Sequence, residues 1–165
     1  MIMTIGNKVF YPYQGLCIIG PVVKREMNGK AVPFYHLSVM DDGGDLYVPV
    51  DKVATVGMRP LLKQSEIPKV LEQLKVKPLP VAARHYSQRA VLNAQLITSG
   101  SALDLAEIVA SLTDFNRTKS LPLGQKKTLD RAKRLLVCEI SEVTGETKQE
   151  VEEQIDLALK AQKEE

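Results

Sequence analysis

The hydrophobic period of this sequence changes once, near residue 62, and that change limits the fold more than any other feature. Up to about residue 62, apolar residues alternate with a period of two in short segments rich in β-branched and aromatic residues, which is typical of strands. From Ser65 onward they recur at i, i+3, i+4 and i+7, which is typical of amphipathic helices. The sequence therefore predicts an α+β protein with a β domain at 1–62 and a helical domain at 65–165, and we interpret Arg59-Pro60 as part of the joint.

Short strands separated by turn residues fill the first domain. The segments with the strand pattern are 8–11, 16–19 with Val22 and Val23, 34–39 and 46–50. Asn28-Gly29 predicts a two-residue hairpin, because a type I′ turn needs positive φ at both central positions. We expect a small, strongly bent antiparallel β-barrel of the SH3 or Tudor type. Pro49 places its strand at an edge or strand end, where a partner strand could pair.

The second domain is expected to be an all-α bundle of about five helices. The first follows Ser65, and the second spans Val81–Ser99 and stops at Gly100. Ser101 offers an N-cap for the third, and we expect a polar loop at 113–120 to follow it. The buried stripes predicted for the first and third helices are Ile67, Val70, Leu71 and Leu74, and then Leu105, Ile108, Val109 and Leu112.

The fourth predicted helix, 122–143, carries different chemistry on its two faces. Its apolar face holds Leu129, Ala132, Leu136, Ile140 and Val143, and its basic face holds Lys127, Arg131 and Arg134, with Lys126 and Lys133 beside them. Thr147 and Glu150 predict a capping box for a fifth helix. The stripe of that helix is Val151, Ile155, Ala158 and Leu159.

The net charge of +2 conceals two regions of opposite sign. Residues 69–134 contain twelve Lys or Arg against five Asp or Glu, whereas residues 135–165 contain three against nine. A basic middle is typical of a polyanion partner, and it is also compatible with an ordinary solvated helical surface. Within it, Tyr86 lies between Arg84 and Arg89, so the aromatic ring either packs in the core or projects into a nucleic-acid groove.

Nothing in the sequence selects an enzyme, a metal site or a cofactor. No spacing pairs His36 or His85 with a nucleophile, and the acidic segment with Asp41, Asp42 and Asp45 has the composition of a turn. No export signal or membrane span is evident, so we expect a cytoplasmic protein. We also expect a monomer without a small-molecule substrate. Cys17 and Cys138 are interpreted as small buried hydrophobes without a disulfide. The aromatics Phe10, Tyr11, Tyr13, Tyr35 and Tyr47 are expected to fill the barrel, although a methyl-lysine cage is the alternative.

Several short motifs follow one another in both domains, and their order and separation are specific when taken together. In the first domain they are Gly6-x-x-Val9-x-Tyr11-Pro12-x-x-Gly15, Phe34-Tyr35-x-Leu37 and Val48-Pro49-x-x-Lys52-Val53-x-x-Val56-Gly57-x-Arg59. In the second they are Tyr86-Ser-x-Arg89, Ser99-Gly100, Leu105-Ala106-Glu107-Ile108-Val109-x-x-Leu112 and Leu121-x-x-Gly124-x-Lys126-x-x-Leu129-x-x-Ala132-x-x-Leu135-Leu136-x-x-Glu139. Through these motifs, almost the whole chain resembles the CarD and CdnL group of bacterial RNA polymerase-binding transcription regulators.

The resemblance implies a Tudor-like domain that binds the RNA polymerase β subunit, shared with the transcription-repair coupling factor, and a helical domain that touches promoter DNA. It implies polymerase contacts at Arg25, Tyr47 and Pro49. In that family, the position that Tyr86 matches is usually a tryptophan, which wedges into the minor groove of the DNA. This chain has no tryptophan. We expect weak, salt-sensitive DNA contact through Arg84, Tyr86, Arg89, Lys126, Lys127 and Arg131 that modulates open-complex stability. The alternative is an adaptor that binds polymerase or another partner without touching DNA.

Overall fold

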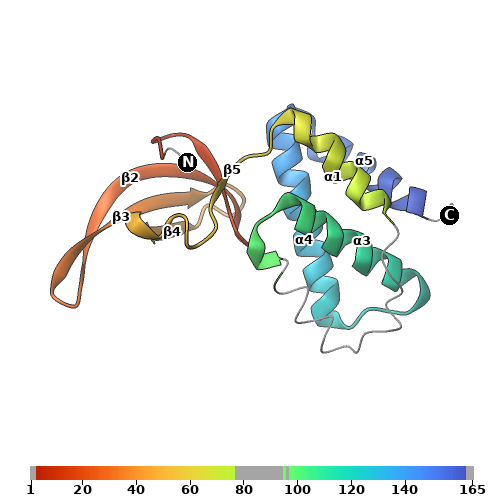
Figure 1. Cartoon of the computed structure of the whole chain (residues 1–165), viewed down its shortest axis with the longest axis horizontal. Coiled ribbons are helices and arrows are strands. Elements are labelled where there is room, and N and C mark those ends of the chain that lie inside the picture. Colours follow the sequence, from red (N-terminus) through yellow and green to blue (C-terminus); the bar gives the residue numbers. More distant parts are fainter. Residues whose placement is uncertain (1–2, 77–94, 96, 163–165) are drawn as a thin grey trace. The chain divides into compact units, whose positions relative to one another are not determined.

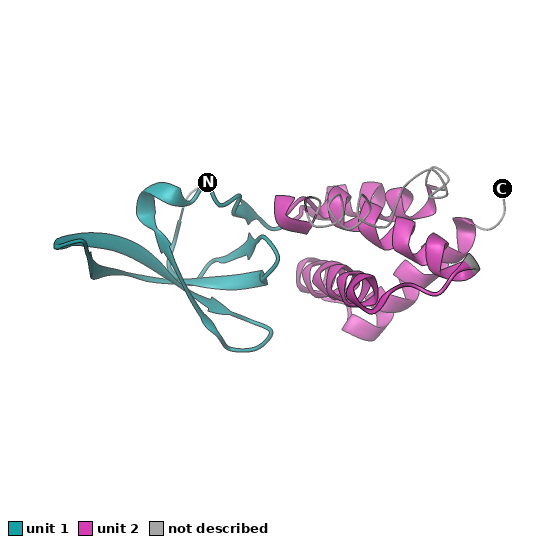
Figure 2. Cartoon of the chain, turned by 90° about the horizontal axis from the view of Figure 1, so that it is seen from below, with its two compact units in different colours: residues 1–61 teal, residues 62–165 magenta. Residues whose placement is uncertain are grey.

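A computed structural model describes residues 3–76, 95 and 97–162 of the chain. The chain divides into two compact units, residues 1–61 and 62–165, which are coloured separately in Figure 2. Most of the predicted second helix, Val81–Ser99, lies outside the described residues, and with it Arg84, His85, Tyr86 and Arg89.

Unit 1 is an antiparallel sheet of five strands in the order β4-β3-β2-β1-β5 (Figure 1). Its strands are β1 Lys8–Tyr11, β2 Gly15–Met27, β3 Lys30–Val39, β4 Asp45–Pro49 and β5 Arg59–Pro60. The predicted strands and their antiparallel pairing are confirmed, and β2 is longer than predicted. The pairing of the described strands is open, with β4 and β5 at its ends, so closure into a barrel stays a prediction.

Arg59-Pro60, interpreted as part of the joint, form β5 against β1, and the division between the units follows them after residue 61. Val9 pairs with Pro60 and Phe10 with Arg59, and the Arg59 guanidinium lies 4.1 Å above the centre of the Phe10 ring. A strand of two residues is too short to show an alternating pattern. Only its pairing with β1 reveals it.

The turns of unit 1 follow the backbone chemistry expected of their residues. Asn28 and Gly29 have φ of 54° and 78°, which confirms the predicted hairpin between β2 and β3. Between Ile19 and Val22 the register shifts, so β2 carries a bulge opposite His36. A short 3₁₀ helix, Val50–Lys52, follows β4.

One face of the sheet carries the core of unit 1. Its buried residues are Val9, Cys17, Ile19, Leu37, Val39, Val48 and Met58. Tyr11 and Tyr35 pack against this core, which confirms for these two that the aromatics fill the interior. Phe10 is fully buried as well, but it lies on the opposite side of β1 from Val9. The same prediction is wrong for Tyr13 and Tyr47, which are 47% and 38% exposed. Tyr13 lies in a turn, and Tyr47 lies on the opposite face of the sheet.

Unit 2 is built from packed helices. They are α1 Ile67–Lys75, preceded by a 3₁₀ turn at Gln64–Glu66, then α3 Ala102–Thr118, α4 Leu123–Thr144 and α5 Lys148–Ala161 (Figure 1). Ser101 and Thr147 cap α3 and α5 by accepting from the N–H groups of Asp104 and Glu150, at 3.4 and 3.1 Å. The predicted stripes of α3 and α5 are buried. In α1 Leu71 is only half-buried, as are Leu129 and Val143 in α4.

The polar loop predicted at 113–120 is wrong, because α3 continues to Thr118. Arg117 donates to the carbonyl oxygen of Leu159 at 2.6 Å and to Oε1 of Gln162 at 3.1 Å. It also lies 3.8 Å from Asp114, one turn earlier. These contacts with the end of α5 stabilise a polar last turn that the local sequence does not predict.

Buried polar side chains form hydrogen bonds with backbone groups before the first helix of unit 2 and at its end. Glu139 is fully buried and accepts from the Leu62 N–H at 2.8 Å, while Nε2 of Gln162 donates to the Leu74 carbonyl at 2.6 Å. Gln125 differs, because it is 3% exposed and neither of its amide atoms has a partner among the described residues. It occupies the third helical position of α4. A capping box would pair it with the N-cap N–H, but the N-cap is Pro122, which has none.

None of the described helices combines the length and the apolar character needed to cross a membrane.

Candidate functional site

The face of the sheet opposite the core gathers a set of polar and aromatic side chains from β2, β3 and β4. We call it the outer face and define it by Arg25, His36, Asp45, Tyr47 and Pro49. Successive side chains of a strand point to opposite sides, so the burial of Leu37 and Val48 in the core places His36 and Tyr47 on the other side. His36 and Tyr47 are direct cross-strand partners, and Pro49 follows two residues later.

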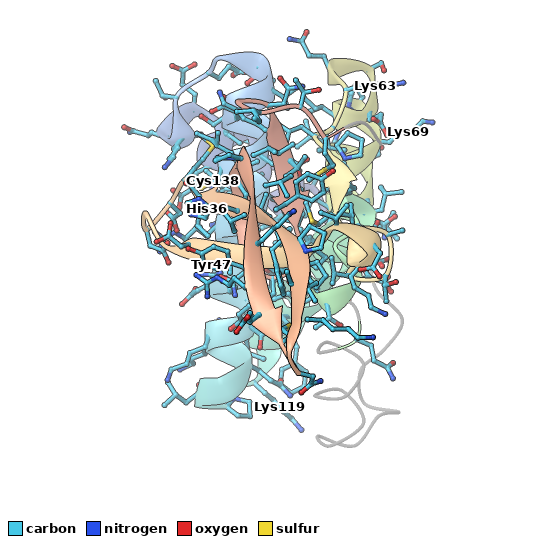
Figure 3. The ribbon with its side chains drawn as sticks, turned by 90° about the vertical axis from the view of Figure 1, so that its left-hand side faces the viewer. His36, Tyr47, Lys63, Lys69, Lys119 and Cys138 are labelled. Atoms are coloured by element: carbon cyan, nitrogen blue, oxygen red, sulfur yellow. The ribbon has the colours of Figure 1, made fainter. Side chains whose placement is uncertain are left out.

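Four side chains of the outer face, those of Arg25, His36, Asp45 and Tyr47, form a chain of contacts. The Arg25 guanidinium carbon lies 3.8 Å from the centre of the Tyr47 ring, within the range of a cation–π interaction. The His36 ring stacks on Tyr47 with 5.0 Å between centroids and 15° between planes. Nε2 of His36 lies 2.7 Å from Oδ1 of Asp45. Figure 3 labels His36 and Tyr47, which lie together on this face.

β4 is the last strand at one end of the sheet. The β4 residues of the outer face are also those whose backbone N–H and C=O groups point away from β3. The Val39 N–H donates to the Gly44 carbonyl at 2.8 Å, so that pair is of the hydrogen-bonded kind. Antiparallel pairs alternate between bonded and non-bonded, which makes Tyr47 and Pro49 non-bonded toward β3. Their main-chain groups therefore point away from the sheet. The missing N–H of Pro49 costs no bond within it, and the predicted edge position of Pro49 is confirmed.

In unit 2, the first half of α4 carries the predicted basic residues. Lys126 and Lys127 are exposed, whereas Arg131 is half-buried and already interacts with another group of the protein. Lys133 is engaged by α5, with Nζ 2.7 Å from Oδ1 of Asp156 and 3.6 Å from Oε1 of Glu152. The acidic helix α5 thus neutralises Lys133, whereas no described acid forms an ion pair with Lys126 or Lys127. We call the exposed pair Lys126 and Lys127 the α4 lysines.

The remaining candidates for chemistry take structural positions. Asp42 accepts from the Gly44 N–H at 2.8 Å, which is the turn interpretation of the acidic segment. No group of three or more His, Cys, Asp or Glu among the described residues could hold a metal ion. Burial raises the pKa of Cys17 to about 12, helped by the charge of Asp42, so its thiol is a poor nucleophile. Both cysteines are free; Cys138 is half-buried, so the prediction that it is buried is wrong.

The structure brings together Arg25, Tyr47 and Pro49, which the sequence grouped only through a family resemblance. Of the predicted DNA contacts, it describes Lys126, Lys127 and Arg131; Arg84, Tyr86 and Arg89 lie outside the described residues. Sequence reasoning missed the place of His36 and Asp45 in the outer face. The signal was available in the register, because pairing across the 41–44 turn aligns Ser38 with Asp45 and His36 with Tyr47.

Comparisons with known proteins agree in both units. Residues 3–62 match the family model described as CarD-like/TRCF RID domain, and residues 69–156 match the model described as CarD, C-terminal domain. The chain is also similar to a protein of Bacillus subtilis (strain 168) that carries the name "Putative transcription factor YdeB". The two are 24% identical over 155 residues, which cover 89% of this chain and 95% of the relative.

Proposed function

Because the chain belongs to the CarD family, we propose that it is a non-enzymatic transcription regulator that binds the RNA polymerase β subunit and promoter DNA. Unit 1 binds the β subunit through the outer face and the β4 edge. Unit 2 contacts DNA through its basic residues, and the two contacts together change the stability of the open promoter complex.

The observation that carries the proposal is the contact of Arg25 with Tyr47 beside an unpaired strand edge. Arg and Tyr are enriched among the residues that dominate the energy of protein interfaces. An open edge supplies backbone donors and acceptors to an added strand, and neighbouring side chains supply selectivity. The outer face combines both features at one short strand, Asp45–Pro49, where Arg25 of β2 lies over the Tyr47 ring. The match of residues 3–62 to a domain family shared with TRCF supports polymerase as the partner.

The α4 lysines support the DNA part of the proposal. Exposed lysines bind phosphates without reading sequence, and their affinity falls with salt. We assign phosphate contacts to Lys126, Lys127 and Arg131 on α4, and to Arg84 and Arg89. Tyr86 takes the wedge position, where a tyrosine has less surface than a tryptophan to trap an unstacked base step. We therefore expect weaker trapping of the open complex than a tryptophan would give.

The engagement of Lys133 by Asp156 and Glu152 supports a second candidate function, an adaptor that binds polymerase without DNA. If α5 neutralised the whole basic face, no cations would remain for a polyanion. The α4 lysines are exposed, so we favour the regulator that contacts both partners.

The first experiment measures binding of the full chain to purified polymerase and to fragments of its β subunit. Arg25→Glu and Tyr47→Ala should each weaken binding about tenfold or more, as expected for central interface residues. Lys52→Glu is the matched control, because Lys52 is exposed in the same unit outside the outer face. Undiminished binding by both variants would remove the polymerase assignment.

The second experiment measures the footprint and lifetime of a polymerase–promoter complex with wild type and Tyr86→Ala. A shorter lifetime with polymerase binding intact is expected if Tyr86 acts as the wedge. An unchanged lifetime and footprint, with and without the protein, would favour the adaptor.

A further inference from the structure

His36 has contacts on several sides, which an exposed strand residue does not require. Its ring stacks on Tyr47, and its Nε2 lies 2.7 Å from Oδ1 of Asp45. Its side chain is 27% exposed, against 59% for that of Asp45. A stack fixes the plane of an aromatic ring, and a hydrogen bond at its far end fixes the rotation within that plane. The His36 ring is therefore held in one orientation.

The backbone of β2 holds His36 from another direction. A Cβ atom at Gly20 would lie 2.8 Å from the His36 carbonyl oxygen and 3.4 Å from its Nδ1. Gly20 lies in the bulge between Ile19 and Val22, where β2 bends. A close backbone approach of this kind is a common reason for glycine within a strand. A Cβ atom at position 20 could be accommodated only by a shift of the backbone at Gly20 or at His36.

We propose that His36 is a positioning residue, which with Asp45 and Gly20 sets the orientation of the Tyr47 ring on the outer face. Tyr47 in turn provides the surface on which the Arg25 guanidinium rests, 3.8 Å from the ring centre. The role of this positioning in recognition rests on the proposed function, in which Arg25 and Tyr47 bind the polymerase β subunit. His36 itself need not touch the partner.

The physical benefit is that Tyr47 and Arg25 are ordered before the partner arrives. Immobilising a side chain at an interface costs conformational entropy, and an interface residue that is already held avoids that cost. The partner suited to such a surface is a protein edge with a fixed shape. The order of dependence is from Asp45 and Gly20 to His36, from His36 to Tyr47, and from Tyr47 to Arg25.

The orientation is tested first on the free full-length protein by NMR. Wild type should show nuclear Overhauser contacts between the Tyr47 and His36 rings. It should also show the Tyr47 ring signals expected of a ring held in one orientation. His36→Ala and Gly20→Ala should make the Tyr47 ring more mobile. His36→Phe should keep most of its order, because the stack is retained and only the hydrogen bond to Asp45 is lost. Asp51→Ala is the control, an exposed aspartate of unit 1 outside the outer face. Unchanged Tyr47 signals in His36→Ala and Gly20→Ala would overturn the positioning role.

Binding to a polymerase β-subunit fragment is tested in a double-mutant cycle. His36→Ala, which loses both the stack and the hydrogen bond, should weaken binding about tenfold. Asp45→Ala and His36→Phe, which keep the stack but lose the hydrogen bond, should each weaken it about threefold. In a Tyr47→Ala background, His36→Ala should add less than about twofold, because its effect passes through Tyr47. An equal loss in both backgrounds would overturn positioning and make His36 a direct contact. If wild type fails to bind the fragment, the proposed function fails, while the NMR result still decides whether His36 orients Tyr47.

Discussion

The two candidate surfaces of this chain hold their cations in different ways. On the outer face of unit 1, Arg25 rests on Tyr47, and Tyr47 is stacked on His36, which is hydrogen-bonded to Asp45. On α4 of unit 2, Lys126 and Lys127 are exposed, and each carries its ammonium group at the end of a long flexible side chain. The first arrangement has a defined shape, and the second has mainly a charge.

This difference indicates which kind of partner suits each surface. A shaped surface with ordered side chains recognises a partner at short range, where packing and hydrogen bonds decide the affinity. Mobile lysines act through long-range attraction to a polyanion, and the affinity they give depends on the release of counterions. The comparison therefore predicts one contact that tolerates salt and one that does not.

The largest expected effect is this difference in salt dependence. If the five cations that are assigned phosphate contacts neutralise about five phosphates, raising salt from about 50 to about 200 mM should weaken the DNA-dependent step about five hundredfold. The affinity for the β subunit should fall by about threefold or less over the same range of salt, because Arg25, held against the Tyr47 ring, is its one charged contact on the outer face. Titration calorimetry with the β fragment and promoter-complex lifetimes give the two slopes. Equal salt slopes for the two contacts would contradict the difference between the outer face and the α4 lysines.

The next effect comes from reversing a single charge of the α4 lysines. Lys127→Glu should reduce the effect on open-complex lifetime at low salt about tenfold and lower the salt slope by about one. It should leave the stability of unit 2 and binding to the β fragment unchanged, because Lys127 is exposed. Lys69→Glu, on the exposed side of α1, is the control for a general change of charge. An unchanged lifetime with Lys127→Glu at low salt would remove the phosphate role of α4.

Much of the architecture can be predicted from local patterns. The period of two and the Asn28-Gly29 turn predict the β2–β3 hairpin, and Ser101 and Thr147 predict where α3 and α5 begin. These signals work because each depends on residues close in the chain. Where a distant contact decides, local patterns fail. The last turn of α3 depends on Arg117 reaching α5, and β5 exists only through its pairing with β1.

The outer face shows the same division. Alternation along β4 already places Asp45, Tyr47 and Pro49 on one side of that strand. That Arg25 would reach Tyr47 could not be read from the sequence, because it depends on the bulge at Gly20 and the bend it gives β2. For the basic residues of α4, helical periodicity predicts a common face, but the pairing of Lys133 with Asp156 depends on how α5 packs.

A smaller effect tests how firmly the first turn of α4 is held beside its lysines. Gln125 is buried with both amide atoms unpaired among the described residues, so Gln125→Met should raise the free energy of unfolding of unit 2 by about 1 kcal/mol. The same change at Gln162, whose amide donates to Leu74 and accepts from Arg117, should lower it. Urea denaturation followed by helical circular dichroism measures both. A loss of stability in Gln125→Met would show that its amide has a partner, and that this turn is better ordered than the comparison assumes.

The smallest expected effect separates Lys133 from the α4 lysines on the same helix. Lys133→Ala removes the ion pairs with Asp156 and Glu152, which are partly exposed, so unit 2 should lose only about 0.5 kcal/mol of stability. That loss should shrink at high salt, because screening weakens surface pairs. Promoter-complex lifetime should stay as in wild type, since α5 already neutralises Lys133. If Lys133→Ala shortened the lifetime as much as Lys127→Glu, α5 would have to release this lysine to DNA, and the cationic surface would extend along α4 beyond the two exposed lysines.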